Sequence, residues 1–224
     1  MVSAKQKIID TIGRFNHKYS RYAVFFDWVK CSALVIANNG ICEQDAVWER
    51  REEEYRQIKQ KYSENEIKTF SHMFGMLCEA YEENIEDVLG DVYMKSGCYS
   101  KELGQFFTPF HLAILNAEAG MPANIENYKE ITVSEPSSGG GANIIAAAKV
   151  ISDRGFDFRE IMKVDAKDLD WLSVYMTYVQ LSLLGISAKV IQGNSLEDND
   201  EWNEKERVFY TPKRRWEMHN GRIS

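Results

Sequence analysis

The sequence predicts an α/β protein in which a helical region precedes a parallel β-sheet. Through residues 1–100, apolar side chains recur at the three- and four-residue spacing of amphipathic helices. Across residues 101–224, short β-branched runs alternate with helix-length segments, an order that gives a parallel sheet with right-handed crossovers. We therefore expect two regions, 1–100 and 101–224.

Three stretches define the expected helical region. Residues 22–37 are mostly apolar but carry two charged residues, so they favour a buried helix over a membrane span, which needs about 18 apolar residues in a row. Residues 45–62 have a charged amphipathic pattern. Ser63 and Glu66 have the spacing of a capping box, which predicts the start of the next helix.

The second region divides into alternating helices and strands. The pattern predicts helices at 110–119, 142–152 and 171–184, and strands at 131–133, 161–166, 188–191 and 207–210. Only these four strands can be counted. A sheet this short leaves an open edge, whose backbone groups must be covered by helices or paired with another chain, such as a second copy.

Composition limits the functions open to the chain. Its 224 residues are 44% hydrophobic and 27% charged, and the N-terminus lacks a signal-like apolar core, so we expect a soluble cytoplasmic protein. The four cysteines form no Cys-x-x-Cys pair, which favours reduced thiols over a metal site.

The net charge of the chain is relevant to whether it binds nucleic acid. The formal net charge of −7 does not favour unaided binding to DNA, whose phosphates attract basic faces. Basic residues do gather late in the sequence, where they could contact a phosphate backbone or form a solvated tail: Lys205, Arg207, Lys213, Arg214, Arg215 and Arg222.

A glycine-rich turn follows the first predicted strand. The segment Glu135-Pro136-Ser137-Ser138-Gly139-Gly140-Gly141 leads directly into a predicted helix. Glycine permits positive φ and leaves room for a ligand, and the first N–H groups of the helix then face that ligand. The turn has neither the dinucleotide Gly-x-Gly-x-x-Gly pattern nor the Gly-Lys-Ser/Thr ending of a P-loop. A tight turn without a ligand is the alternative.

Polar residues follow the next two predicted strands. Asp168 and Asp170 come at the end of the second strand, where a carboxylate can accept hydrogen bonds from ribose hydroxyls. Asp170 could instead cap the following helix, and both roles can hold together. Asn194, after the third strand, could bind the edge of an adenine ring or simply form a turn.

Three segments taken together resemble a known family. They are Gly104-Gln105-Phe106-Phe107-Thr108-Pro109, the glycine-rich turn, and Gly193-Asn194-Ser195-Leu196. The set resembles class I S-adenosylmethionine-dependent methyltransferases, specifically the N6-adenine DNA methyltransferases related to the modification subunit of type I restriction systems. The resemblance covers roughly residues 87–196, because 87–93 also look like the family's lead-in to its Gln-Phe-Phe-Thr-Pro segment.

The resemblance implies a Rossmann-like sheet that binds S-adenosylmethionine or S-adenosylhomocysteine. In the family the first segment covers the methionine end of the cofactor, and an acidic residue that matches Asp168 binds the ribose. The implied cofactor-binding residues are Gln105, Phe106, Phe107, Thr108, Pro109, Glu135, Pro136, Ser137, Gly139, Gly141, Asp168, Asn194 and Ser195.

The sequence departs from the family where catalysis should occur. The Asn/Asp-Pro-Pro-Tyr/Phe segment that holds the flipped adenine is absent after Leu196. The nearest segment, with Tyr210, Thr211 and Pro212, offers hydroxyls and one proline but no Asn or Asp acceptor. Glu135 replaces the usual Asp, and the family's sheet usually has seven strands, so this sheet is expected to be truncated.

Two functions follow from these observations. One is an adenine-specific DNA methyltransferase that works with partners, such as a restriction-modification subunit. The other is a catalytically inactive, cofactor-binding accessory, decoy or regulatory protein of a phage or mobile element.

Overall fold

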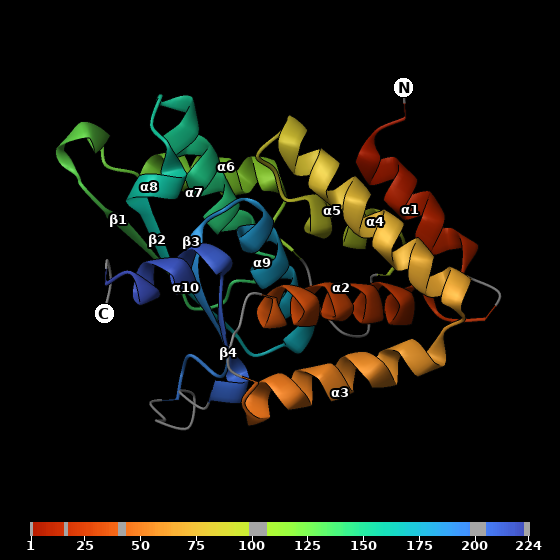
Figure 1. The fold of residues 1–224 in the computed structure, drawn as a ribbon. Coiled ribbons are helices and arrows are strands. Elements are labelled where there is room, and N and C mark those ends of the chain that lie inside the picture. Colours follow the sequence, from red (N-terminus) through yellow and green to blue (C-terminus); the bar gives the residue numbers. More distant parts are fainter. Residues whose placement is uncertain (1, 16–17, 40–43, 99–106, 198–204, 222–224) are drawn as a thin grey trace. The chain divides into compact units, whose positions relative to one another are not determined.

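The structure is a computed structural model that describes residues 2–15, 18–39, 44–98, 107–197 and 205–221 (Figure 1). Its contacts divide the chain into two compact units. The helical unit comprises Met1–Asn84 and Val88–Phe106, and the sheet unit comprises Ile85–Asp87 and Phe107–Ser224. None of the helices in the described part of the chain is long and apolar enough to cross a bilayer.

Five helices form the described part of the helical unit: α1 (Ala4–Arg14), α2 (Arg21–Asn38), α3 (Ala46–Lys61), α4 (Glu64–Glu83) and α5 (Val88–Lys95). Their core is rich in aromatic and branched side chains, including Ile8, Ile12, Phe25, Trp28, Leu34, Met73, Leu77 and Tyr93. The apolar side chains that recur at helical spacing in the sequence therefore pack together as the core of this unit.

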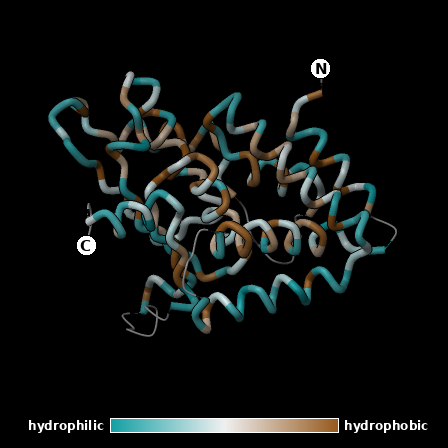
Figure 2. The backbone as a smooth tube through the Cα atoms, viewed as in Figure 1, coloured by the Kyte–Doolittle hydropathy of each residue, from teal (hydrophilic) through white to brown (hydrophobic). Residues whose placement is uncertain are grey.

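Three helices of this unit have the features that the sequence predicted. The capping box at Ser63 and Glu66 is present, so α4 begins where it was predicted. The buried helix is α2, in which the carboxylate of Asp27 accepts hydrogen bonds from Lys61 Nζ at 3.2 Å and from the Tyr62 hydroxyl at 3.0 Å. Figure 2 shows α3 as hydrophilic along most of its length, in agreement with its charged pattern.

The sheet unit contains a four-stranded sheet in the order β1-β2-β3-β4. Its strands are β1 (Ile131–Glu135), β2 (Met162–Asp168), β3 (Ser187–Gln192) and β4 (Val208–Tyr210). Its longer helices are α6 (Phe110–Gly120), α7 (Ala142–Asp153), α9 (Trp171–Leu183) and α10 (Pro212–His219), with shorter turns η2 (Ile125–Asn127), α8 (Phe158–Ile161) and η4 (Lys205–Arg207). Helix α9 packs on β2 and β3, α7 packs on β1, and α6 packs on α7.

Three strands run parallel, as the alternating pattern predicted. The register places Val133 of β1 beside Val164 of β2, and Val164 beside Ala188 of β3. β2 and β3 supply the buried centre of the sheet, where Val164, Ala188 and Val190 have no exposed surface. Parallel strands place their carboxyl ends at one side of a sheet, so the loops after β1, β2 and β3 meet there.

The fourth strand corrects the expectation of an all-parallel sheet. β4 pairs with β3 in the antiparallel direction, with Tyr210 beside Lys189 and Phe209 beside Val190. Among the described residues between β3 and β4, η4 is the only helical segment, and a single turn of this kind is too short for the crossover that parallel strands need. The sheet is therefore mixed, and β4 ends where the three parallel strands begin.

Candidate cofactor-binding site

The loops after β1, β2 and β3 are hydrogen-bonded to one another at the carboxyl end of the sheet. The amide of Ser138 donates to the Lys167 carbonyl at 2.9 Å, and the amide of Gly193 donates to the Asp168 carbonyl at 2.8 Å. The Ser195 hydroxyl donates to the Pro136 carbonyl. The structure thus brings the glycine turn, the acidic segment and the Gly193–Leu196 segment into one site.

The turn between β1 and α7 requires glycine at two positions. Gly139 and Gly141 have φ values of +52° and +95°, which side chains disfavour. A Cβ atom on Gly139 would lie 3.1 Å from the Phe107 ring, and one on Gly141 would lie 3.3 Å from Thr177 Oγ1. The turn is therefore tightly enclosed, and the Phe107 ring lies directly against it.

Side chains of α9 hold this turn from behind. Thr177 Oγ1 donates to the Gly139 carbonyl at 2.9 Å, and Gln180 Nε2 contacts the Gly140 carbonyl at 2.5 Å. Gln180 Nε2 also donates to Asp87 Oδ1 at 2.8 Å. Thr177 and Gln180 have no exposed surface, and Asp87 is buried. These contacts fix the carbonyl groups of the turn on the side that faces α9.

Sequence reasoning did not identify Thr177 and Gln180 as site residues. The available signal was two polar side chains, three positions apart, in a helix that is otherwise mostly apolar. A buried polar group needs a hydrogen-bond partner, so such a pair indicates a polar feature of the backbone opposite it.

Asp168 lies at the centre of the site and binds backbone amides. Its Oδ2 accepts from Gly139 N at 2.8 Å, and its Oδ1 accepts from Asp170 N at 2.9 Å. Burial raises the pKa of Asp168, and the backbone N–H groups of Asp170, Gly139 and Leu169 oppose this rise without cancelling it. Each carboxylate oxygen can accept a second hydrogen bond, so Asp168 can brace the turn and still accept from a ligand.

Asp170 caps α9, which is the alternative role that the sequence indicated for this residue. Its Oδ2 accepts from Ser173 N at 2.9 Å. This contact satisfies one of the amides that a helix start leaves without an intrahelical partner.

Asn194 forms a local turn. Its Oδ1 accepts from Leu196 N at 3.1 Å, and its Nδ2 donates to Glu197 Oε1 at 2.8 Å. Both ends of the amide thus have partners within the same loop, which is the turn-forming alternative from the sequence. Ser195 joins this loop to Pro136.

Glu135 contacts both the turn and the start of α7. Its Oε1 accepts from Ser137 N at 3.3 Å, and its Oε2 accepts from Asn143 Nδ2 at 3.2 Å. Gly141 occupies the N-cap of α7, and no side chain caps that helix. The buried Asn143 Oδ1 has no hydrogen-bond partner in the described structure. The first turn of α7 thus has N–H groups without a side-chain cap and an amide oxygen without a donor, both close to Glu135.

The segment from Gln105 to Pro109 is only partly described. Gln105 and Phe106 lie outside the described residues. Phe107 packs against Gly139, whereas Thr108 and Pro109 are exposed, and the Pro109 carbonyl accepts from Leu112 N at 2.9 Å as α6 begins.

The structure does not bring Tyr210, Thr211 and Pro212 to this site. They follow the antiparallel β4 and lie at the amino end of the sheet, where β1, β2 and β3 begin. Thr211 Oγ1 donates to the Ile186 carbonyl at 2.7 Å, accepts from Ala188 N at 2.9 Å and caps α10. With no exposed surface, Thr211 joins α10 to β3.

The amino end of the sheet also holds a buried ion pair. Lys163 Nζ donates to Glu217 Oε1, and the Ser187 hydroxyl donates to Glu217 Oε2. Burial alone would raise the pKa of Glu217, but the hydrogen bonds from Lys163 and Ser187 and the charge of Lys163 together lower it. This carboxylate is therefore engaged on both oxygens by side chains of the sheet.

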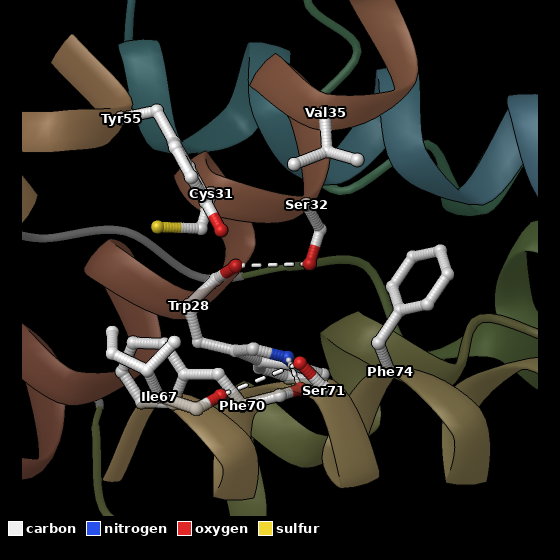
Figure 3. Close-up of a pocket in the computed structure, with 9 residues that line it drawn as sticks. All are labelled: Trp28, Cys31, Ser32, Val35, Tyr55, Ile67, Phe70, Ser71 and Phe74. Carbon is white, nitrogen blue, oxygen red and sulfur yellow. Dashed lines mark hydrogen bonds between the residues drawn. The ribbon is translucent and has the colours of Figure 1, made fainter. Parts of the chain in front are cut away.

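The helical unit contains an apolar pocket of about 150 Å³ (Figure 3). Its lining residues are Trp28, Cys31, Ser32, Val35, Tyr55, Ile67, Phe70, Ser71 and Phe74. Trp28 Nε1 donates to the Phe70 carbonyl at 3.2 Å, and Ser32 Oγ donates to the Trp28 carbonyl at 2.9 Å. Burial raises the pKa of Cys31 to about 12, so its thiol stays protonated at neutral pH. The pocket has no charged lining residue and resembles an imperfectly filled core.

Comparison with known proteins finds a likeness in structure but not in sequence. No protein-family model matches the chain, and no curated protein matches its sequence. A crystal structure from Listeria monocytogenes, described as a candidate class I S-adenosylmethionine-dependent methyltransferase, matches with a TM-score of 0.51 and 12% sequence identity. The match covers 88% of this chain and 55% of that protein, so this chain spans about half of its length. The chain therefore has the fold of the class I S-adenosylmethionine-dependent methyltransferases.

Proposed function

We propose that the sheet unit binds S-adenosylmethionine at the carboxyl end of β1, β2 and β3. The observation that carries this proposal is the enclosed turn at Gly139–Gly141, whose first amide donates to Asp168 at 2.8 Å. This arrangement joins the turn after β1 to the acidic residue that ends β2. In open α/β sheets, ligands bind outside the carboxyl ends of the parallel strands, which is where this junction lies.

The residues present fit the chemical groups of this cofactor. The uncapped first turn of α7 offers N–H groups and the positive end of a helix dipole to a carboxylate. The second acceptor positions on Asp168 suit ribose hydroxyls. Phe107, against Gly139, supplies an apolar surface beside the turn. When bound, S-adenosylmethionine supplies an electrophilic methyl group on a sulfonium centre.

Isothermal titration calorimetry with S-adenosylmethionine and S-adenosylhomocysteine tests the site. We expect saturable binding of both, and we expect Gly139→Ala to weaken it because the added methyl group must displace Phe107 or the turn. Gly155→Ala is the matched control, since Gly155 also has a positive φ, of +87°, but nothing within 4 Å of an added Cβ. Absence of binding to the folded wild-type protein, by heat and by thermal shift, would refute the proposal.

Methyl transfer is a separate question. If the resemblance extends to the reaction, the methyl group would be transferred to N6 of adenine in DNA. The partner would be a restriction-modification subunit or a second copy of this chain. However, Tyr210, Thr211 and Pro212 lie at the opposite end of the sheet, and the net charge of −7 does not favour DNA. We therefore favour a cytoplasmic, cofactor-binding accessory, decoy or regulatory protein of a phage or mobile element over a methyltransferase that acts alone.

A transfer assay separates these two functions. Protein with methyl-labelled S-adenosylmethionine and adenine-rich DNA should leave the DNA unlabelled, even though the cofactor binds. Labelled N6-methyladenine would establish the enzyme instead. If that activity also survived Tyr210→Ala and Thr211→Ala, the acceptor site would have to lie outside the β4–α10 segment.

A further inference from the structure

β1 is a lateral edge of the sheet. Within the described residues it pairs with β2 and with no other strand. An edge strand presents a row of backbone N–H and C=O groups that can pair with another chain. β1 contains no proline or lysine, which are common means of blocking such an edge.

A groove of about 550 Å³ runs along this edge. It is lined by Glu130, Ile131, Thr132 and Val133 in succession. Successive residues of a strand point to opposite faces of a sheet. Ile131, Val133 and Glu135 belong to one face and Thr132 to the other, so the groove extends from one face around the side of the strand. The groove therefore gives access to the backbone of β1.

Small side chains on the neighbouring helices make room for a backbone in this groove. Its other wall comes from the end of α6 and the segment after it and from α7, including Ala117, Gly120 and Ala147. Helix α6 is itself sparsely covered, because Ala113 is its one buried residue among those described and Leu115 is 63% exposed. An extended segment in the groove would cover Ala117 and Gly120, the α6 residues without polar side chains that line it.

The charge of the groove indicates the chemistry of its occupant. Its two charged lining residues are Glu130 and Glu135, near the two ends of β1. An occupant with lysine or arginine on either side of an apolar stretch would complement them. A second copy of β1 would instead bring its own two glutamates into the same groove, and like charges on paired strands are destabilising.

We propose that the β1 edge is a docking site for an extended segment of a partner protein, which adds to the sheet as a strand and carries basic residues at both ends. Main-chain hydrogen bonds to β1 would supply affinity, and the two glutamates would supply specificity. The groove shares Glu135 and Asn143 with the candidate cofactor site, so peptide binding is measured without added cofactor, and its result then does not depend on the proposed function.

Fluorescence anisotropy with designed peptides tests the proposal. The probe is a labelled peptide with the core Val-Thr-Val-Thr-Val between paired lysines, and its matched control carries paired glutamates. We expect the lysine peptide to bind at least about tenfold more tightly. N-methylation of alternate core residues, in the frame that faces β1, should abolish binding because it removes the backbone donors.

Variants of the protein locate the binding. Glu130→Lys should weaken binding of the lysine peptide by about tenfold or more, whereas Glu126→Lys, an equal charge change at an exposed residue outside the groove lining, should leave it nearly unchanged. Gly120→Leu should block the groove without a clash in the folded protein, because nothing lies within 4 Å of a Cβ there. Thermal unfolding should show that all three variants fold.

Three results would overturn the proposal. The first is equal binding of the lysine and glutamate peptides. The second is self-association of the wild-type protein that Gly120→Leu abolishes, which would make a second copy the occupant. The third is no peptide binding by folded wild-type protein, as expected if another segment of this chain already fills the groove.

Discussion

The two ends of the β-sheet each hold a buried carboxylate, and the two groups are in opposite situations. At the amino end, Glu217 is bound by Lys163 and Ser187, and its pKa is lowered. At the carboxyl end, Asp168 is bound by backbone amides, and its pKa is raised. Within the described residues no lysine or arginine forms an ion pair with Asp168, whereas Glu217 has Lys163.

This difference distinguishes a structural contact from a binding site. A buried carboxylate with a cation and a hydroxyl on its oxygens has little capacity left for a ligand. A buried carboxylate held by amides, without a counter-charge, costs folding energy and keeps acceptor positions for a ligand. We therefore assign stability to the amino end and ligand binding to the carboxyl end.

The largest effect should come from removing the cation at the amino end. Lys163→Met removes the nearer cation of the buried Glu217, leaving Lys213 Nζ at 4.0 Å from Glu217 Oε1, and should destabilise the fold by about 3 kcal/mol. Urea denaturation measures this loss. Lys149→Met is the control, because Lys149 pairs with Asp153 on the surface and should contribute less than about 1 kcal/mol. Equal losses in the two variants would remove the distinction between the buried and the exposed pair.

At the carboxyl end, Asp168→Asn should affect binding more than folding. The change removes a charged acceptor, so affinity for S-adenosylmethionine should fall by about 1.5–3 kcal/mol, or roughly ten- to a hundredfold. Calorimetry measures the affinity, and Lys163→Met protein that remains folded should bind nearly as well as wild type. An unchanged affinity for Asp168→Asn would place the ribose contact on another residue, with Asp170 the first to test.

Thr211→Val tests whether the β4–α10 segment is structural. Valine leaves the amide of Ala188 without its partner and removes the cap of α10, so stability should fall by about 1–3 kcal/mol. Thr211→Ser, which keeps the hydroxyl, should recover most of that loss. Cofactor affinity should not change in either variant, and a marked fall would connect this segment to the site.

The smallest effects should appear in the pH dependence of stability. Because the pKa of Asp168 is raised, the folded state holds this proton at a pH where the unfolded chain has lost it, so this residue favours folding more as pH falls toward about 4. Because the pKa of Glu217 is lowered, its contribution is present above about 4.3 and is lost as pH falls through the folded pKa.

Two variants separate these contributions. From about pH 6 to about pH 3, wild type should gain stability relative to Asp168→Asn and lose stability relative to Glu217→Gln. Urea denaturation at several pH values gives both differences. Differences of the same sign would contradict the contrast between the two carboxylates.

Local features of the fold could be predicted from the sequence, because they depend on residues close together in the chain. The capping box at Ser63, the cap at Asp170 and the strand–turn–helix around Gly139–Gly141 follow from side-chain chemistry and glycine conformation. The order of the strands and helices also follows, because apolar periodicity records local burial.

Features that depend on distant pairing could not be predicted. β4 has three residues, and a strand so short carries no signal of direction, so its antiparallel pairing with β3 was missed. That direction is what moves Thr211 to the amino end of the sheet. The contact between Gln180 and Asp87 joins residues 93 positions apart, and neither residue type identifies the other as its partner.

The most direct test of the central assignment is an NMR titration of the labelled protein with S-adenosylmethionine. We expect saturable shifts of the amides of three segments of the site: Gly139–Gly141, Asp168–Asp170 and Gly193–Ser195. The amides of Lys163, Ser187 and Thr211, at the amino end, should stay in place. Shifts confined to the amino end, or none in folded protein at saturating cofactor, would contradict the assignment of ligand binding to the carboxyl end.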